Sequence, residues 1–262
     1  MLAFCSAAIA DGNPQAGKGQ ANETPQRADG EPGVMAGKVV LRADVKPVDN
    51  DHLDPAHAIQ ELENLGCSVY PYEGAPAYAV TGVGFRWGSN FWDENIPLLQ
   101  AFPNLTTIDF RHTKICGTRI WNAGLKKLAN LKKLTTLNFS TTGIGDDALK
   151  EIGRLKGLTG LILSKTQITD AGLKELTDLT DLAELNVSDT GITGAGLAKL
   201  KTLKKLTTLS ACRTCLTDDD VMGISELKNL RSIVLSRYQV TDGALRRLRA
   251  SAPNLHVVRR DE

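Results

Sequence analysis

LTGLILSKTQITDAGLKELTDLTD, residues 158–181, is followed directly by LAELNVSDTGITGAGLAKLKTLKK, residues 182–205, and the two 24-residue stretches align position by position. Both open with the pattern L-x-x-L-x-hydrophobic, and both carry Ile-Thr ten residues later. The same pattern recurs at intervals of 29, 24, 24, 24 and 24 residues, with its leading residue at Leu105, Leu134, Leu158, Leu182, Leu206 and Leu230. Self-similarity at a fixed period of this length is typical of a solenoid.

Each period is expected to fold as a strand, a turn and a helix. Its opening residues alternate apolar and polar side chains, as a strand buried on one face requires. Eight residues after each leading leucine stands a threonine whose hydroxyl is expected to bond the turn backbone, until Tyr238 breaks the column: Thr113, Thr142, Thr166, Thr190 and Thr214. Helix N-caps and favourably placed first-turn acids follow at Thr169, Thr193, Thr217 and Thr241, and at Asp170, Asp218 and Asp242. Only stacking hides the apolar face of such a repeat.

A family resemblance follows from these segments. Ile168-Thr-Asp-Ala-Gly-Leu-Lys-Glu-Leu176 and the strand unit Leu182 to Val187 resemble the 24-residue ITDAGL-type leucine-rich repeats of bacterial proteins, which are similar to the repeats of F-box-associated adaptors. The resemblance covers residues 105–258. It implies an α/β fold, a right-handed leucine-rich-repeat solenoid with a parallel β-sheet on the concave face, helices on the convex face and an N-terminal cap. It implies binding in general and no single ligand. Residues 38–104 contain no F-box-like segment, which argues against the ligase-adaptor version.

Three parts are expected along the chain. Residues 1–37 are interpreted as a disordered leader, because they are rich in small and polar residues and poor in large apolar ones after the first few positions. Residues 38–104 form an N-terminal cap region. It contains an aromatic cluster and a helix over Asp54 to Leu65, with Asp at the cap, Pro at the first helical position and Gly66 as the stop. Residues 105–262 form the solenoid.

The first residues leave the cellular location open. Leu2 to Ile9 is a short apolar run that ends in a small-residue pattern but has no basic segment before it. It is either a clipped secretory signal peptide, which would make the protein extracytoplasmic (secreted or periplasmic), or a plain apolar N-terminus of a cytoplasmic protein. No run of 18 apolar residues occurs, so the sequence predicts no transmembrane span.

Charge is distributed unevenly along the chain. Residues 1–121 carry 9 Lys and Arg against 14 Asp and Glu, whereas residues 122–262 carry 22 against 16. The basic excess falls largely in pairs such as Lys204-Lys205, which are interpreted as outer helix surface. A nucleic-acid site usually gathers its cations into a stripe with polar or aromatic readers, so a nucleic-acid partner is not favoured.

The solvent-facing side chains of the sheet are the expected recognition surface. They are mostly short hydroxyl and amide groups, and the candidate contacts among them are Thr136, Asn138, Ile162, Glu184, Asn186, Thr208 and Ser210. The alternative is that crowded strands simply favour small polar residues. Aromatic side chains concentrate between Tyr70 and Trp121. They are either the buried core of the cap or an anchor site, with Trp87 and Trp92 as exposed contacts.

No pattern of catalytic residues is found. The sequence lacks nucleophile-elbow, Walker-type and dinucleotide-binding motifs, so no enzyme activity, cofactor or metal is predicted. Cys212 and Cys215 form a C-x-x-C without a second pair to complete a zinc site. Cys212 is either a small residue in a serine column or half of a redox pair.

The sequence therefore predicts a non-catalytic module that presents its sheet face or its aromatic cap to a protein partner of unknown identity. Three alternatives remain: a structural domain of a larger assembly, a redox-responsive protein using Cys212 and Cys215, and a polyanion binder acting through the basic C-terminal half.

Overall fold

A computed structural model describes residues 54–70, 79–85, 89–91, 93–111 and 124–261. The chain divides into two units, residues 1–47 and 48–262, and every described residue belongs to the second unit. The expected leader therefore lies outside the described residues.

The described part opens with the expected helix. Helix α1 (Pro55–Asn64) begins at the predicted proline, and the Asp54 carboxylate accepts hydrogen bonds from two first-turn amides at 3.3 and 3.4 Å. Gly66 follows with φ 83°, a left-handed conformation that glycine adopts without steric cost. The next two strands, β1 (Cys67–Tyr70) and β2 (Gly82–Phe85), pair antiparallel.

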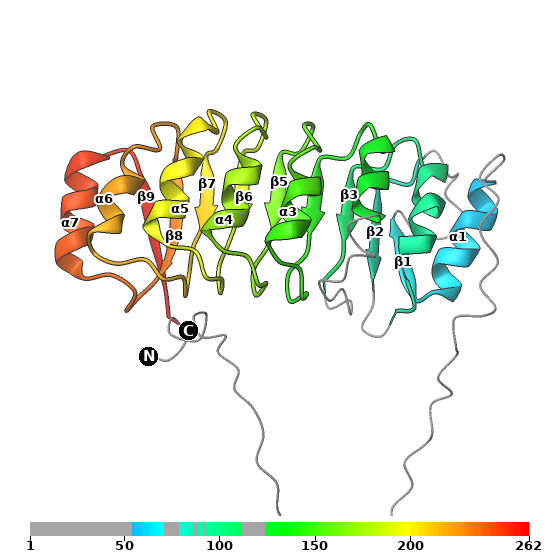
Figure 1. The fold of residues 1–262 in the computed structure, drawn as a ribbon, viewed down its shortest axis with the longest axis horizontal. Coiled ribbons are helices and arrows are strands. Elements are labelled where there is room, and N and C mark those ends of the chain that lie inside the picture. The colour runs from blue at the N-terminus through cyan, green and yellow to red at the C-terminus, as the bar shows by residue number, and fades with distance from the viewer. Residues whose placement is uncertain (1–53, 71–78, 86–88, 92, 112–123, 262) are drawn as a thin grey trace, which may run out of the picture. The chain divides into compact units, whose positions relative to one another are not determined.

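From β2 onward the strands pair in parallel. The described strands form one nine-stranded sheet in chain order, so parallel pairing begins within the predicted cap region. The strands after β2 are β3 (Thr107–Asp109), β4 (Thr136–Asn138), β5 (Gly160–Ile162), β6 (Glu184–Asn186), β7 (Thr208–Ser210), β8 (Ser232–Ser236) and β9 (His256–Arg260). Helical turns alternate with them on one side of the sheet (Figure 1).

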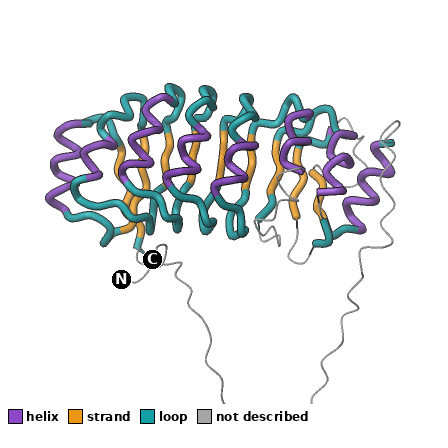
Figure 2. The backbone as a smooth tube through the Cα atoms, viewed as in Figure 1, coloured by secondary structure: helices purple, strands orange, loops and turns teal. Residues whose placement is uncertain are grey.

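These helical segments are short (Figure 2). Several combine an α-helical turn with a 3-10 turn. Their bounds are η3 (Asp93–Ala101), η4 (Leu128–Asn130), α3 (Asp146–Ile152), α4 (Asp170–Leu173), η5 (Lys174–Leu176), α5 (Gly194–Lys199), η6 (Leu200–Thr202), α6 (Asp220–Ile224) and α7 (Asp242–Ser251). The expected strand–turn–helix solenoid is thus confirmed.

The core is built from repeated columns of apolar side chains. The central strand residues, such as Leu137 and Leu161, are fully buried. At the N-terminal end, three rings at the ends of β2, β3 and β4 stack: Phe85 on Phe110 with centroids 4.8 Å apart, and Phe110 on Phe139 at 5.0 Å. Phe91, tilted against Phe85, is buried as well. Phe85, Phe91 and Phe110 of the aromatic cluster are therefore core residues. This agrees with the expectation that the cluster is the buried core of the cap.

The turn after each strand is fixed by the threonine column. The Thr142 and Thr166 hydroxyls are buried, and each donates at 2.6 Å to the carbonyl three residues earlier. The residue before each described threonine of this column has a positive φ of 50–58°, although none is glycine. These residues are Thr141, Lys165, Asp189 and Arg213. Where Tyr238 breaks the column, the Oε1 atom of Gln239 accepts from the Ser236 amide of the same turn at 3.2 Å, and its Nε2 atom donates to the Thr214 hydroxyl of the preceding repeat at 2.7 Å.

Helix N-caps are linked from one repeat to the next. Thr169 caps α4 by accepting from the Ala171 amide, and its own amide and hydroxyl donate to the Asp146 carboxylate of the preceding repeat, at 2.8 and 2.6 Å. Thr193 pairs with Asp170 in the same way. The predicted cap at Thr241 is confirmed too, and it bonds Asp218. Acids predicted to serve only the helix dipole therefore also join neighbouring repeats.

Two of these carboxylates, those of Asp146 and Asp170, lie directly against a glycine of the next repeat. A Cβ atom placed on Gly172 would lie 2.4 Å from the Asp146 Oδ1 atom, and one on Gly196 would lie 2.1 Å from the Asp170 Oδ1 atom. Such distances are far below van der Waals contact, so the glycine of the ITDAGL motif makes room for the aspartate of the repeat before it.

One interface reverses this arrangement. Gly194 occupies the aspartate position, and Asp220 occupies the glycine position of the following repeat. The Asp220 carboxylate accepts from the Thr217 amide and hydroxyl at 2.9 and 2.8 Å, so the same two groups are satisfied from the opposite side. Thr217 was predicted as an N-cap, but α6 starts later and its cap residue is Asp219.

The last strand places a charge in a core column. In β9, Arg259 pairs with Leu235 of β8, a fully buried core residue. The Arg259 guanidinium donates to the Asp242 carboxylate and to the Arg237 carbonyl. Inward-pointing charges of this kind protect an edge strand from pairing with another chain.

Candidate functional site: the open face of the sheet

Two columns of side chains cover the sheet face opposite the helices. Strand register aligns the first column as Tyr70, Gly82, Thr107, Thr136, Gly160, Glu184, Thr208, Ser232 and His256. The second column runs through Ser68, Gly84, Asp109, Asn138, Ile162, Asn186, Ser210, Val234 and Val258. The residue between the columns points into the core, so the face is a narrow strip two side chains wide.

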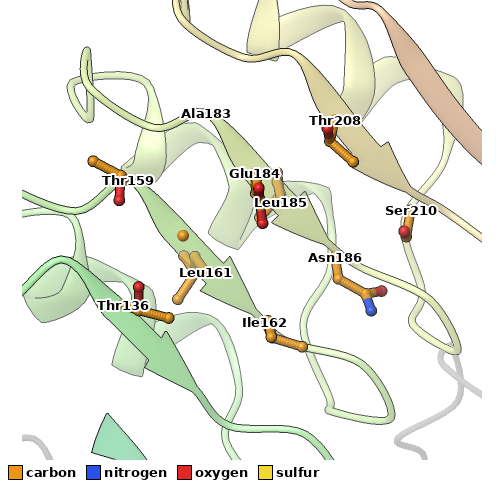
Figure 3. A pocket seen from close by; sticks show the side chains of 11 residues that line it. Thr136, Thr159, Leu161, Ile162, Ala183, Glu184, Leu185, Asn186, Thr208 and Ser210 are labelled. Atoms are coloured by element: carbon orange, nitrogen blue, oxygen red, sulfur yellow. The ribbon is translucent and has the colours of Figure 1, made fainter. Parts of the chain in front are cut away.

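A hollow of about 350 Å³ opens in this strip over strands β4 to β7. It exists because Gly160 places no side chain between Thr136 and Glu184. A Cβ atom built on Gly160 would have only Thr136 atoms as its three nearest neighbours, at 3.4 to 3.9 Å. Figure 3 shows the Glu184 side chain at the centre of the hollow, with Thr136 and Thr208 to either side of it. The volume lies at the lower end of the range of ligand pockets.

The hollow mixes apolar and hydrogen-bonding groups. Ile162 contributes a partly exposed apolar wall, and Asn186 and Ser210 continue the same column beyond it (Figure 3). The Asn186 Oδ1 atom accepts from the Ser188 amide at 3.0 Å, which holds the carboxamide in place. Its amino group is a hydrogen-bond donor on the surface of the strip.

Glu184 carries the charge of the hollow. Its side chain is exposed, and no described residue forms an ion pair or a side-chain hydrogen bond with it. Asp109, farther along the strip, is different: it pairs with Arg111 at 2.8 Å. The hydrogen bond and the charge of Asp109 raise the pKa of the Arg111 guanidinium above its ordinary value. The Glu184 carboxylate thus has hydrogen-bonding capacity that the described part of the chain leaves unused.

Most of the predicted contact residues come together here. The residues among them that line the hollow are Thr136, Ile162, Glu184, Asn186, Thr208 and Ser210. Asn138 does not face solvent as expected: it is only 8% exposed. Its Oδ1 atom accepts from the Ser140 amide and hydroxyl, at 3.0 and 2.6 Å, so it closes the turn that follows β4. Trp87 and Trp92 lie outside the described residues.

Tyr70 is a surface residue of the strip that the sequence did not single out. It ends β1 in register with Gly82, and its side chain is 43% exposed. The ring lies over the glycines of β2, since a Cβ atom on Gly82 or Gly84 would approach it to 3.7 or 3.6 Å. The sequence feature that could have indicated it is Gly82-Val83-Gly84. Its two glycines leave the outward face of the strand without side chains, so an aromatic ring can pack there.

The cysteines do not form the suggested C-x-x-C pair. Cys212 is a buried free thiol, whereas Cys215 is disulfide-bonded, so the two are not bonded to each other. Cys212 lies in the serine column, and its amide donates to the Ser188 hydroxyl at 3.2 Å. Burial raises the pKa of the Cys67 thiol to about 12, which disfavours its thiolate form at neutral pH.

Many lysines of the basic half have structural partners. The ammonium groups of Lys132, Lys204 and Lys228 each donate at 3.0 Å to a carbonyl three residues earlier, near the end of a helical segment. Cations at this position offset the negative end of the helix dipole. Lys205 also pairs with Asp181 at 2.7 Å, so part of the basic excess is neutralised within the repeats.

Within the described ranges, no cluster of three His, Cys, Asp or Glu side chains is arranged to hold a metal ion. The described helices are all too short or too polar to cross a membrane.

Comparison with known proteins supports the repeat assignment. A family model described as a leucine-rich repeat matches residues 130–153 and 179–201. Among solved structures, an internalin from Listeria monocytogenes is 17% identical with a TM-score of 0.36; the match covers 64% of this chain and 64% of that chain. No curated protein matches the sequence. The repeat match and the parallel strand–turn–helix architecture together establish a leucine-rich-repeat fold.

Proposed function

We propose that this leucine-rich-repeat solenoid is a protein-interaction module that binds its partner on the open face of the sheet. The observation that carries the proposal is the hollow at Gly160, which brings the unpaired Glu184 carboxylate together with hydroxyl and amide groups on a rigid sheet. Leucine-rich-repeat domains generally serve protein binding, and stacked repeats create extended binding surfaces. Neither the sequence motifs nor the described side chains support a reaction.

The dimensions of the strip limit the kind of complex. Eight strand spacings of about 4.8 Å separate β1 from β9, so the strip is about 38 Å long, and a three-residue strand spans about 10 Å. The resulting area of about 400 Å² is roughly half of what each partner contributes to a standard interface. A partner confined to the strip is therefore held weakly. A tighter partner also covers the turn edge beside it, where Lys165 and Arg213 are exposed.

Affinity capture with matched variants tests the proposal. The sheet-face variant combines Thr136→Ala, Glu184→Gln and Thr208→Ala, and the control variant combines Lys150→Ala with Glu226→Gln, two exposed residues away from the strip. Wild type and control should retain the same proteins from an extract of the source organism, and the sheet-face variant should lose them. Retention of the same proteins by the sheet-face variant would refute the assignment of this face.

A further inference from the structure

We infer that the hollow at Gly160 receives a basic side chain, arginine or lysine, from an extended segment of a protein partner, with the Glu184 carboxylate as its counter-charge. The inference rests on the proposed function, since it specifies what kind of partner group the sheet face accepts.

The first support is charge. Glu184 is the charged group among the residues that line the hollow, and no described residue neutralises it. Two other acids are already paired: Asp109, which lies in the strip, with Arg111, and Asp189 with Arg213. A carboxylate can accept two parallel hydrogen bonds from one guanidinium, or one charge-assisted bond from an ammonium group. An acidic segment or a nucleic-acid backbone would instead bring negative charge toward Glu184.

The second support is shape. Arginine and lysine carry a long apolar stem that packs along apolar surface while the charged end stays polar. The hollow offers this combination, because Gly160 pairs with Glu184 in the strand register and Ile162 lines the same hollow. Short Thr136 and Thr208 side chains keep the hollow open on both sides of Glu184 in the same column. A bulky residue at position 160 would close it.

The third support is the spacing of side chains along the strip. Tyr70 and Glu184 belong to the same column and are five strands apart, which is about 24 Å. An extended segment of about seven residues spans that distance at ~3.4 Å per residue. The Asn186 amino group next to Glu184 is placed to donate to a carbonyl of such a segment. The exposed Tyr70 ring then provides an apolar contact at its far end.

Peptide titration tests the inference directly. The probes are three heptapeptides of alanine and serine with a single central arginine, citrulline or glutamate, added to the full chain labelled with nitrogen-15. The arginine peptide should shift amide resonances of Gly160, Glu184 and Asn186, whereas citrulline, which has the same shape without the charge, should bind roughly tenfold or more weakly. Equal shifts from the arginine and citrulline peptides, or shifts confined to residues outside the strip, would overturn the inference.

Two variants extend the test. Glu184→Gln keeps the size of the side chain and should abolish the preference for arginine over citrulline, while Glu226→Gln removes the same charge elsewhere and should leave that preference intact. Gly160→Lys places a tethered ammonium group in the hollow and should block the peptide while the protein keeps its wild-type circular dichroism. Unchanged arginine preference in Glu184→Gln would refute the role of the carboxylate. If capture on the sheet face still occurs in that case, the proposed function stands and only the chemistry of the partner is wrong.

Discussion

Exchanging Gly194 and Asp220 should reveal how neighbouring helices share their caps. In the wild type these two residues stand in reversed order relative to the other interfaces, and the Asp220 carboxylate holds the Thr217 amide and hydroxyl at 2.9 and 2.8 Å. Gly194→Asp should destabilise the protein for two reasons. Its Cβ atom would lie 2.1 Å from the Asp220 Oδ1 atom, and its side chain would place a second carboxylate beside that of Asp220. Asp220→Gly should also destabilise it, because Thr217 loses both bonds.

The magnitudes can be estimated for each change. Loss of the Asp220 bonds should cost about 1 kcal/mol, as for a helix-cap residue. Overpacking by Gly194→Asp should cost about 1–3 kcal/mol. The double variant places the carboxylate where Asp170 stands relative to Thr193, an arrangement that forms the same pair of bonds. It should therefore approach wild-type stability, with a coupling energy close to the sum of the two single costs, about 2–4 kcal/mol.

The wild type, the two single variants and the double variant are unfolded in urea at pH 7 and followed by circular dichroism. Their four free energies of unfolding give the coupling energy between positions 194 and 220. A matched control introduces the reversed order at an ordinary interface, with Asp170→Gly and Gly196→Asp made singly and together. It should show coupling of the same sign. Additive effects in the Gly194 and Asp220 cycle, or a neutral Gly194→Asp variant, would refute the reasoning.

Three further predictions address other features. Lys165 has φ 57°, so Lys165→Gly should raise the free energy of unfolding by up to about 1 kcal/mol, and a lowered midpoint in urea would contradict the assigned backbone strain. Hydrogen bonds from the Thr241 hydroxyl and then its amide lower the pKa of Asp218; the stabilisation they supply is complete above the unfolded-state pKa of about 3.9 and is lost as pH falls through the folded-state pKa. Asp218→Asn should therefore melt below wild type at pH 7 and together with it near pH 2, and a difference that persists in acid would show another cause. Arg259→Leu should expose an apolar edge and cause concentration-dependent association in sedimentation velocity, whereas the exposed-site control Arg249→Leu should not; a monomeric Arg259→Leu protein would argue against the protective role of this charge.

Features that repeat within one period could be predicted from the sequence. The leucine columns, the turn threonines and most N-caps recur every 24 residues, so their positions and roles follow from one repeat. The bonds between Asp146 and Thr169 were not predicted, because they link different repeats and require the exact lateral packing of two helices. The reversal at Asp220 shifted one helix start for the same reason.

The candidate site was likewise predictable only in part. Thr136, Glu184 and Thr208 could be placed on the sheet face from alternation alone. The hollow could not, because it results from the missing side chain of Gly160 within a column that only the strand register defines. Tyr70 lies on an antiparallel strand outside the periodic region, so no repeat pattern marked it.

The reversed pair also limits how the gene can gain or lose repeats. Removal of the 24 residues 169–192 would bring Asp146 against Thr193 and Gly196, an interface of the usual kind. Removal of residues 193–216 would bring Asp170 against Asp220, with two carboxylates in one space. Removal of residues 217–240 would leave Gly194 against Thr241, with no carboxylate at all. Loss of a whole repeat should therefore keep the usual cap bonds on the N-terminal side of this interface and disrupt them across it, so we expect the reversed pair to stay at a fixed place in the array.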